Sequence, residues 1–391
     1  MIPPRDASPK PAAERPIGLR HTERVPAHCV WEITNACNLD CVHCESESGA
    51  RRADELSTEE ALALCDDLAA LGCRVVNLSG GEPFLRPDWR RIGARLVEKG
   101  IEPIMVSNLT CVGGDDFDAL DRLGIEWVAT SVDGPPAVHD RIRRTRGQAW
   151  SAFAKTQAAI TSLKQRGRKV GVITHVSLWN LAHLDELAAI LASLRVDLWQ
   201  LQIGQPSGRL RAIAGEYLIY PGQIEAIYAF IKRVRRAGQL NLHAADDIGF
   251  FGPDEIEVRA NGGEPGFFAG CEAGHRVLAI ASDGTIRGCP SLEIDVGNLR
   301  ETPLADIWAD EARFWWNRFD PGQTQGLCRG CAFQRLCRCG CTGLALATTG
   351  SVHRNIYCIN QIKNLGGDPD RREVAGVPLP AGPGATTGGG R

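Results

Sequence analysis

The feature that most constrains the fold is a regular alternation of short apolar, β-rich runs with helical patterns between residues 28 and 203. The pattern predicts six strands, at residues 28–34, 74–78, 103–107, 126–131, 169–176 and 198–203. It predicts helices between them, at residues 57–71, 88–98, 117–123, 149–166 and 184–194. Such alternation forms right-handed βαβ units around a parallel sheet, and six units are too few for a closed eight-unit barrel. We therefore predict an α/β fold, an open partial (β/α)6 barrel with ligand chemistry at the carboxyl ends of its strands.

The first predicted helix has clear local signals. Ser57 and Glu60 stand three residues apart, which is the spacing of a capping box at a helix N-terminus. The apolar residues that follow recur at steps of three and four: Ala61, Leu64, Cys65, Leu68 and Leu71. One buried stripe results, so we expect Cys65 to belong to the core.

The regular alternation stops after residue 203. The pattern predicts a helix at residues 222–237, a glycine-rich linker at 248–270 and a hairpin at 276–289 that turns at 282–285. Residues 301–318 predict one aromatic-rich helix, and we expect its apolar side chains to be core residues: Ile307, Trp308, Phe314 and Trp315.

Composition and charge exclude several classes of function. The chain of 391 residues has 44 basic and 47 acidic residues, so it lacks the basic excess that drives nucleic-acid binding. No apolar stretch approaches the roughly 20 residues of a membrane-spanning helix, and the start has no apolar signal-peptide core. We expect a cytoplasmic protein with no nucleic-acid and no membrane partner.

Fifteen cysteines are unusual for a reducing compartment, which disfavours disulfides and favours metal or redox chemistry. Their distribution is uneven: three lie within residues 37–44, none between Cys111 and Cys271, and eight within residues 271–358. Random core cysteines would scatter. The four that stand in or beside apolar patterns are expected to pack as small hydrophobic residues: Cys29, Cys65, Cys73 and Cys111.

The first cysteine group follows the first predicted strand directly, with Cys37, Cys41 and Cys44 in eight residues. Three soft ligands suit an iron–sulfur cluster or zinc. A structural zinc site needs four ligands, and His43 is too close to Cys44 in the chain to complete a tetrahedron. A cluster bound by three thiolates leaves one iron open for a substrate or a cofactor.

This C-x3-C-x2-C loop after the first strand of a partial barrel resembles the radical S-adenosylmethionine (SAM) superfamily. In that family the open iron binds SAM, and the reduced 4Fe–4S cluster cleaves it to a 5′-deoxyadenosyl radical. The resemblance extends to the later strand ends and implies SAM contacts from Gly80, Gly81, Glu82, Pro83, Asn108, Ser131 and Arg143. The Gly-Gly-Glu-Pro loop would meet the methionine amino group, Asn108 and Ser131 the ribose and methionine, and Arg143 the carboxylate. Taken alone, the two glycines would be an ordinary turn and Arg143 part of a solvated basic face.

The second cysteine group combines a hairpin glycine, Gly284, with seven spaced cysteines: Cys271, Cys289, Cys328, Cys331, Cys337, Cys341 and Cys358. This pattern resembles the SPASM domain, which binds auxiliary iron–sulfur clusters. The resemblance implies one complete 4Fe–4S site at Cys328, Cys331, Cys337 and Cys358. It implies a second 4Fe–4S site at Cys271, Cys289 and Cys341, with an open or non-cysteine position because residues 272–288 contain no cysteine.

Two features of this group leave alternatives open. Cys339 is an extra thiol that could be a spare, an alternative ligand or a buried residue. A zinc knuckle formed by Cys328, Cys331, Cys337 and Cys341 is the other reading of the spacing. That reading leaves Cys271, Cys289 and Cys358 unexplained.

Most SPASM-bearing relatives modify ribosomally made peptides, and residues 205–209 (Gln-Pro-Ser-Gly-Arg) resemble the corresponding stretch of mycofactocin-type maturases. The resemblance therefore implies a peptide-modifying radical SAM oxidoreductase that takes electrons from a reductant such as flavodoxin or ferredoxin. Only about 27 residues precede the first strand, too few for a fused leader-binding domain, so a separate leader-recognition protein is expected.

Other functions stay open. One is a radical dehydrogenase or decarboxylase of a small molecule, namely a sugar, an alcohol or a tetrapyrrole. An electron carrier would need the cysteines but not Glu82 and Arg143. Four residues on predicted strands are either substrate contacts or core: His175, Trp199, Gln200 and Gln202.

We predict five segments along the chain. They are a disordered arm (1–25), the radical SAM partial barrel (26–210), a linker or helical bridge (211–270), the SPASM domain with its hairpin and helix (271–365) and a disordered tail (366–391).

Overall fold

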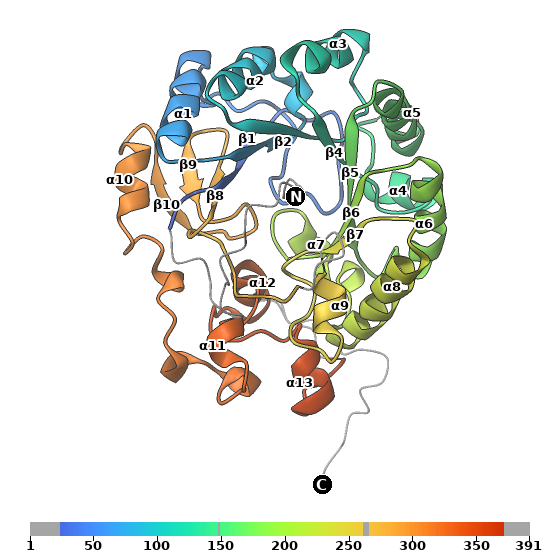
Figure 1. Ribbon diagram of the computed structural model, residues 1–391, viewed down its shortest axis with the longest axis vertical. Coiled ribbons are helices and arrows are strands. Elements are labelled where there is room, and N and C mark those ends of the chain that lie inside the picture. The colour runs from blue at the N-terminus through green and yellow to red at the C-terminus, as the bar shows by residue number, and fades with distance from the viewer. Residues whose placement is uncertain (1–23, 148, 261–265, 371–391) are drawn as a thin grey trace, which may run out of the picture.

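One ten-stranded sheet runs through the molecule, in the order β10-β9-β8-β1-β2-β3-β4-β5-β6-β7 (Figure 1). The computed structural model describes residues 24–147, 149–260 and 266–370. The strands are β1 (His28–Thr34), β2 (Val75–Gly80), β3 (Glu102–Ser107), β4 (Trp127–Ser131), β5 (Lys169–Val176), β6 (Leu198–Ile203), β7 (Leu242–Ala244), β8 (Val277–Ile280), β9 (Thr285–Arg287) and β10 (Asp295–Asn298). Each neighbouring pair from β1 to β7 is parallel, which confirms the predicted α/β partial barrel.

Helices α1–α6 and α8 cover the outside of the curved sheet, and α11–α13 lie across its open side (Figure 1). The α-helices are α1 (Thr58–Ala70), α2 (Trp89–Glu98), α3 (Gly114–Leu123), α4 (Pro136–Ile142), α5 (Ala152–Gln165), α6 (Leu184–Ser193), α7 (Leu210–Tyr217), α8 (Ile224–Ala237), α9 (Glu255–Arg259), α10 (Leu304–Ala309), α11 (Gln334–Cys337), α12 (Thr342–Thr349) and α13 (Ile359–Asn364). Short 3-10 turns lie at Pro83–Leu85, Leu181–His183, Pro221–Gln223, Trp315–Asn317, Pro321–Gln323 and Gly326–Cys328.

The local predictions for the first half of the chain are confirmed. All six predicted strands are present, and their ends shift by no more than two residues. Helix α1 begins with the expected capping box: Glu60 N–H donates to Ser57 Oγ at 3.2 Å, and Ser57 N–H donates to Glu60 Oε2 at 2.7 Å. Cys65 lies fully buried in the core, as its place in the apolar stripe predicts.

The stretch 211–270, expected to be a linker or helical bridge, extends the barrel. Helix α8 buries one apolar face, and β7 pairs in parallel with β6. The sequence prediction missed β7 because three residues carry too little periodicity, and it also missed α4 and α7. The predicted domain boundaries themselves stay predictions.

The predicted hairpin is present, and its place in the sheet is a new finding. Strands β8 and β9 pair antiparallel, as do β9 and β10. Strand β8 also pairs in parallel with β1, so that His28 faces Val277 and Trp31 faces Ile280. The hairpin thus continues the barrel sheet on the β1 side.

The single helix predicted for residues 301–318 is wrong. Helix α10 stops at its C-cap Asp310, whose Oδ1 accepts the N–H of Ala312 and so competes with helix continuation. Beyond this break Trp316 turns inward and its Nε1 donates to the carbonyl of Ala273 at 2.9 Å. Trp315, expected in the core, is 46% exposed instead.

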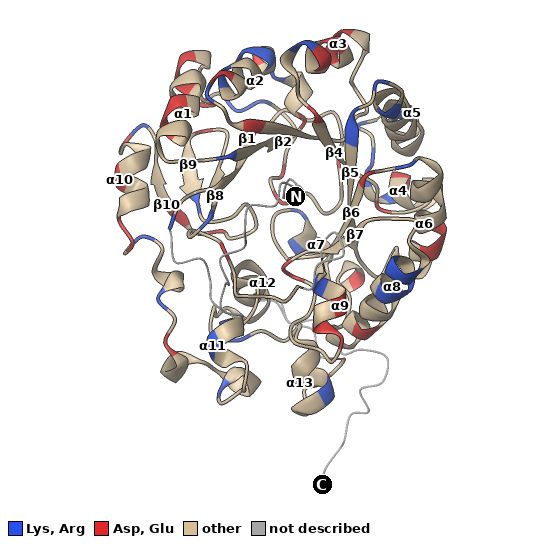
Figure 2. Ribbon diagram, viewed as in Figure 1, with Lys and Arg blue, Asp and Glu red and all other residues tan. Residues whose placement is uncertain are grey.

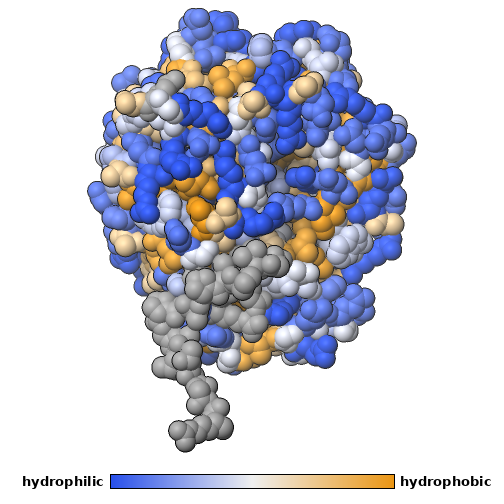
Figure 3. Space-filling view, turned by 180° about the vertical axis from the view of Figure 1, so that it is seen from behind, coloured by the Kyte–Doolittle hydropathy of each residue, from blue (hydrophilic) through white to orange (hydrophobic). Residues whose placement is uncertain are grey.

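The surface carries both charge signs interspersed over the outer helices (Figure 2). On the face turned away in Figure 1, apolar side chains form separate patches among polar ones (Figure 3). Among the described residues no helix combines the length and apolar character of a membrane span. The predicted arm (1–25) and tail (366–391) fall outside the described residues except for 24–25 and 366–370.

Candidate functional site

The loop after β1 carries Cys37, Cys41 and Cys44, and its backbone is docked on the segment that follows α4. Asp40 N–H donates to the carbonyl of Arg144 at 2.7 Å, and Val42 N–H donates to that of Ile142 at 3.0 Å. The three cysteines cluster around the buried side chains of Leu39 and Ala152. We call this segment, residues 37–44, the radical loop.

Each thiol of the radical loop faces a hydrogen-bond donor. Leu39 N–H points at Cys37 Sγ (3.5 Å), Arg143 Nη1 at Cys41 Sγ (4.0 Å) and Ser48 N–H at Cys44 Sγ (3.4 Å). Burial raises the pKa of Cys37 to about 12 and that of Cys41 to about 11, so without a metal these thiols keep their protons. Donors aimed at sulfur suit a negatively charged thiolate, and a metal displaces the thiol proton. The donor set therefore fits an iron–sulfur cluster.

Gly80, the last residue of β2, and Gly81 after it let the chain pack closely on the strand that leads to the radical loop. Gly80 has φ +129°, and a Cβ there would lie 2.2 Å from the carbonyl oxygen of Thr34. A Cβ on Gly81 would lie 2.2 Å from the carbonyl oxygen of Ala36. Gly81 N–H donates to Thr34 at 2.8 Å and Glu82 N–H donates to Ala36 at 2.7 Å. Glycine is therefore required here for backbone–backbone contact, whatever else this loop touches.

Glu82 is fully buried where β2 and β3 end, next to Pro83, which opens a 3-10 turn. Its carboxylate accepts hydrogen bonds from Ser107 Oγ and Asn108 N–H, both at 2.8 Å. Burial still dominates and raises the pKa of Glu82 to about 7. Near neutral pH this side chain is therefore poised between its two protonation states.

Asn108 connects the end of β3 to the radical loop. Its Nδ2 donates to Asn38 Oδ1 at 3.0 Å and lies 3.9 Å from Cys37 Sγ. Its Oδ1 accepts from the N–H of Thr110 at 2.8 Å. Ser131, at the end of β4, is half-buried at the same edge of the sheet.

Arg143 is paired with an aspartate that the sequence prediction did not single out. Its Nε donates to Asp133 Oδ2 at 2.6 Å, while Nη2 lies 3.3 Å from His43 Nε2. Burial would raise the pKa of Asp133, but the charge of Arg143 outweighs it and holds that pKa well below its usual range. Asp133 lies two residues beyond the end of β4, and an acidic residue at the carboxyl end of a parallel strand is the signal that could have found it.

Four predicted candidates on β5 and β6 divide between core and site. Trp199 is core: it is fully buried and its Nε1 donates to Thr174 Oγ1 at 2.8 Å. His175 is buried with its ring 4.7 Å from that of His43, and neither of its ring nitrogens has a hydrogen-bond partner among the described residues. Gln200 and Gln202 are half-buried, and Gln200 Nε2 donates to Gln202 Oε1 at 3.4 Å.

The structure brings Cys271, Cys289 and Cys341 together, and we call them the inner group. Cys341 is the N-cap of α12, and Gln205 Nε2 lies 3.7 Å from its Sγ. Burial, and then the neighbouring Cys271, raise the pKa of both Cys289 and Cys341, to about 12 for Cys289. A Cβ on Gly343 would lie 2.8 Å from both Gln205 Oε1 and the Ser291 carbonyl oxygen, so α12 packs tightly here.

Two contacts link residues close to the inner group with the end of the radical loop. Ser291, two residues after Cys289, donates its Oγ hydrogen to Glu45 Oε2 at 2.8 Å. Gly208, φ +46°, sits so close that a Cβ would lie 2.5 Å from the Cys44 carbonyl oxygen, and Arg209 N–H donates to that oxygen at 3.1 Å. The stretch 205–209 thus touches Cys44 at one end and Cys341 at the other.

The remaining predicted ligands line one cavity, and we call them the outer group: Cys328, Cys331, Cys337 and Cys358. The cavity holds about 300 Å³ of empty space. Gln361 Nε2 donates to Cys328 Sγ at 3.1 Å and Asn360 Nδ2 to Cys331 Sγ at 3.5 Å. The extra thiol, Cys339, also lines this cavity, at φ +66° and hydrogen-bonded to Cys328.

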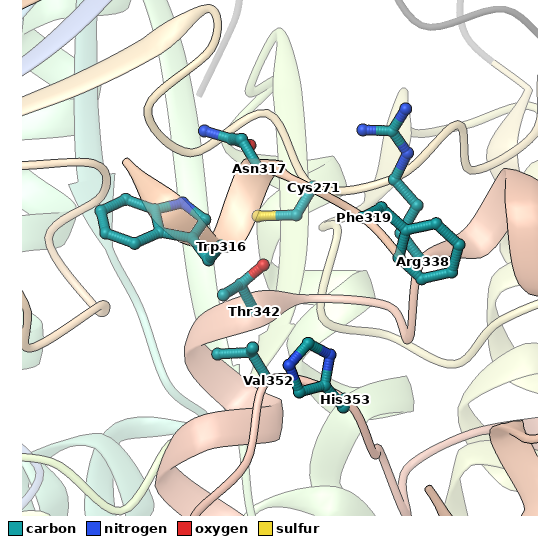
Figure 4. A pocket seen from close by; sticks show the side chains of 8 residues that line it. All are labelled: Cys271, Trp316, Asn317, Phe319, Arg338, Thr342, Val352 and His353. Carbon is teal, nitrogen blue, oxygen red and sulfur yellow. The ribbon is translucent and has the colours of Figure 1, made fainter. Parts of the chain in front are cut away.

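Cys271 of the inner group also lines a second pocket, of about 360 Å³. Figure 4 shows the Cys271 sulfur between Trp316 and Thr342, with Arg338 and His353 across the pocket. The inner group therefore has a polar and aromatic opening of its own.

None of the 15 cysteines, all of which lie in the described part of the chain, forms a disulfide. Within the same residues no three His, Cys, Asp or Glu side chains sit tightly enough to hold one metal ion. A four-iron cluster binds each thiolate through a different iron, so its thiolates stand further apart than those around zinc. Cys341, the fourth cysteine of the alternative zinc knuckle, is not among the residues that line the cavity shared by Cys328, Cys331 and Cys337.

Comparison with protein families decides the broad identity. The model of the radical SAM superfamily matches residues 31–191, and that of the SPASM iron–sulfur cluster-binding domain matches residues 271–332. The chain therefore contains a radical SAM domain followed by a SPASM domain. This radical SAM protein is an enzyme whose cofactors are SAM and 4Fe–4S clusters.

Named relatives of this radical SAM enzyme act in two kinds of chemistry. An AdoMet-dependent heme synthase of Methanosarcina barkeri is 29% identical and covers 85% of the chain and 96% of the relative. A mycofactocin maturase of Mycobacterium ulcerans is also 29% identical, with 84% and 88% covered. The crystal structure of Streptococcus suis SuiB bound to SAM shares the fold, with a TM-score of 0.63 at 15% identity over 85% of this chain and 76% of SuiB.

Proposed function

We propose that this radical SAM enzyme generates a 5′-deoxyadenosyl radical at the radical loop and modifies a ribosomally made peptide by hydrogen abstraction. In this proposal Cys37, Cys41 and Cys44 hold the SAM-binding cluster, which supplies reductive cleavage of SAM when bound and reduced. The outer group and the inner group each hold an auxiliary 4Fe–4S cluster. Flavodoxin or ferredoxin is the proposed class of reductant, and a separate protein the proposed means of recognising the leader peptide.

The proposed SAM site uses the residues at the ends of β2, β3 and β4. Glu82 supports this role because a cofactor ammonium beside a carboxylate with a pKa near 7 favours its charged form. Arg143 supports carboxylate binding, since its Nη atoms face the radical loop while Asp133 holds Nε. Asn108 and Ser131 are the proposed contacts to the ribose and methionine parts, and Gly80, Gly81 and Pro83 shape the loop.

The observation that carries the peptide substrate is the acidic character of the region between the radical loop and the inner group. Glu45 follows Cys44 directly, and burial raises its pKa to about 7. After burial and Cys271, the charges of Glu45 and Asp246 also raise the pKa of Cys289. Carboxyl groups here suit the N–H donors of a peptide better than the several carboxylates of a tetrapyrrole, which they would repel. The mycofactocin maturase relative agrees with this choice.

A tetrapyrrole substrate is the second candidate. It is favoured by relatives named as heme synthases, one of which is matched over 96% of its length, and by a relative named Fe-coproporphyrin III synthase. Sequence identity does not separate the two candidates, because the heme synthase and the maturase are both 29% identical to this chain.

The first experiment tests the radical activity. Reduced, iron-reconstituted enzyme incubated with SAM is expected to release 5′-deoxyadenosine. The triple variant Cys37→Ala, Cys41→Ala, Cys44→Ala is expected to lose this product while it keeps the absorbance of the auxiliary clusters. Persistent cleavage in the triple variant would refute the assignment of the radical loop.

The second experiment separates the substrates. A short peptide encoded beside the gene is expected to raise 5′-deoxyadenosine release and to lose one or more hydrogens by mass spectrometry. Iron-coproporphyrin III, tested in parallel, is expected to remain unchanged. Loss of carbon dioxide from the porphyrin would establish the second candidate in place of the first.

A further inference from the structure

The inner group is one ligand short of a complete four-iron site, and two buried oxygen atoms without hydrogen-bond partners among the described residues lie beside it. They are Oδ1 of Asp247 and Oε1 of Gln205. Gln205 touches the group through Nε2, which faces Cys341 Sγ at 3.7 Å. A carboxylate or amide oxygen buried without a partner is costly, so each of these atoms calls for a partner from outside the chain, a water molecule or a bound group.

Asp247 follows β7 and lies near the inner group, since its Oδ2 accepts from Ile203, two residues before Gln205, and its charge acts on Cys341. The side chain of Asp247 is only 8% exposed. Among the neighbouring charges that raise the pKa of Cys341, that of Asp247 comes second, after Cys271 and ahead of Cys289. Oδ2 accepts the N–H of Ile203 at 3.2 Å, at the carboxyl end of β6, which leaves Oδ1 with no partner in the described part of the chain. The carboxylate is therefore anchored by one oxygen and offers the other.

The backbone around Asp247 is held on both sides by one buried arginine. Arg259 Nη1 donates to the carbonyl of Ala245 at 2.6 Å, and its Nη2 donates to that of Gly249 at 2.7 Å. Gly249 adopts φ +50°, and a Cβ there would lie 2.7 Å from Ile224 Cγ2. A loop fixed in this way can present a ligand atom in one position, as a metal site requires.

We propose that Asp247, through Oδ1, is the fourth protein ligand of the inner auxiliary cluster. The proposal rests on the cysteine ligands proposed above for that cluster. An ionised carboxylate brings the negative charge that the three thiolates also bring, whereas the amide oxygen of Gln205 is neutral and its Nε2 is the atom facing the sulfur. Without iron, burial raises the pKa of Asp247 to about 8, and a metal cation at Oδ1 would favour the ionised form.

A closed inner cluster has a functional consequence. With all four irons bound by the protein, the cluster offers no position to substrate and passes electrons instead. The substrate then meets only the radical loop and its surroundings.

The test uses the full chain with the radical loop disabled, because the SAM-binding cluster itself has an open iron. The variant Cys37→Ala, Cys41→Ala, Cys44→Ala is expected to keep about eight irons, four per auxiliary cluster. Reduced protein is treated with ¹³C-cyanide, which binds only an iron that lacks a protein ligand, and the ¹³C hyperfine coupling is measured by ENDOR. We expect no coupling in this background and a clear coupling once Asp247→Ala is added. Asp246→Ala, a change to the exposed neighbouring carboxylate, is the matched control and should show none.

Two results overturn the assignment of Asp247. One is a ¹³C hyperfine coupling from cyanide in the triple-cysteine background itself. That result does not depend on whether any Asp247 variant folds. The other is no coupling after Asp247→Ala at an unchanged iron content. If the background variant binds about four irons or none, one or both auxiliary clusters are missing. That result overturns the cysteine ligand sets of the proposed function, and it is distinguishable from the two results above, which concern Asp247 alone. Asp247→Cys, which restores a ligand, should keep about eight irons and exclude cyanide.

Discussion

The inner and outer cysteine groups are attached to the molecule in different ways. The inner group is built into the barrel, since β8 pairs with β1 between Cys271 and Cys289, and Gln205 from the end of β6 reaches Cys341. The outer group takes its hydrogen-bond donors Asn360 and Gln361 from the same C-terminal segment. Its contact outside that segment is with the stretch after β7, where Cys358 Sγ donates to the carbonyl of Phe250 at 3.5 Å. The difference indicates that changes in the inner group should reach the radical loop, whereas the outer group should be separable from it.

The largest effect is expected from removing a proposed ligand of the outer group. Cys331→Ala should lower the iron content from about twelve to about eight per chain, because a four-iron cluster is lost. Uncoupled SAM cleavage should persist, since the radical loop keeps its contacts. Cys289→Ala should lower the iron content equally and also slow cleavage through the Ser291–Glu45 contact. Equal cleavage in the two variants, by 5′-deoxyadenosine release, would contradict the comparison.

A tight contact offers the next largest effect. Gly343→Ala places a Cβ 2.8 Å from Gln205 Oε1 and the Ser291 carbonyl, so it should destabilise the protein by about 1–3 kcal/mol. Gly114→Ala is the matched control, because it also lies near a helix N-terminus but has no described atom within 4 Å of the added Cβ. The midpoints of urea unfolding measure both. A control that loses as much stability as Gly343→Ala would rule out the packing explanation.

A smaller effect is expected where α1 meets the segment after β10, away from both groups. Arg300 Nε donates to Glu60 Oε1 at 2.7 Å and lowers the pKa of Glu60 to about 2. Because the unfolded carboxyl has the higher pKa, this stabilisation is present above about pH 4.5 and is lost as the pH falls toward 2. Glu60→Gln should cost at most about 1 kcal/mol at pH 7, since the pair is exposed. Its deficit relative to wild type in urea unfolding should shrink at pH 4, and a constant deficit would exclude the ion pair as its source.

The smallest effect is expected from replacing Cys339, which lines the outer cavity together with the four proposed ligands. Cys339→Ser should leave the iron content near twelve, because four other cysteines complete that site, whereas Cys328→Ser should lose about four irons. Iron analysis of the two purified variants decides the matter. Loss of iron from Cys339→Ser would make Cys339 a ligand in place of one of the four.

Much of the fold followed from local sequence patterns, and what was missed depends on contacts between distant residues. The alternation of apolar runs predicts β1–β6, and the capping box predicts the start of α1, because both signals are contained in a few neighbouring residues. The pairing of β8 with β1 has no such signal, since parallel register is set by the whole core. Trp315 and Trp316 illustrate the same limit, because only the position of Ala273 decides which of the two turns inward.

The candidate site divides in the same way. The cysteine spacing by itself indicates iron–sulfur chemistry, whereas Gly80 and Gly81 by themselves indicate only a turn, because the backbone that they approach belongs to another strand. The pairing of Arg143 with Asp133 could not be predicted, because their chain separation resembles that of any two surface charges. Asp247 lies in a stretch expected to be a linker or helical bridge, and only the fold brings it near Cys341.

The pairing of β1 with β8 also affects synthesis of the chain. Strand β1 leaves the ribosome well before the partner on one of its sides, Val277–Ile280, which is made only after β2–β7. At about 5–20 residues per second, that edge of the nascent sheet stays unpaired for on the order of tens of seconds. An unpaired, apolar strand edge is a template for association with other chains. Newly made chains should therefore depend on chaperones during this interval, well before any iron is inserted.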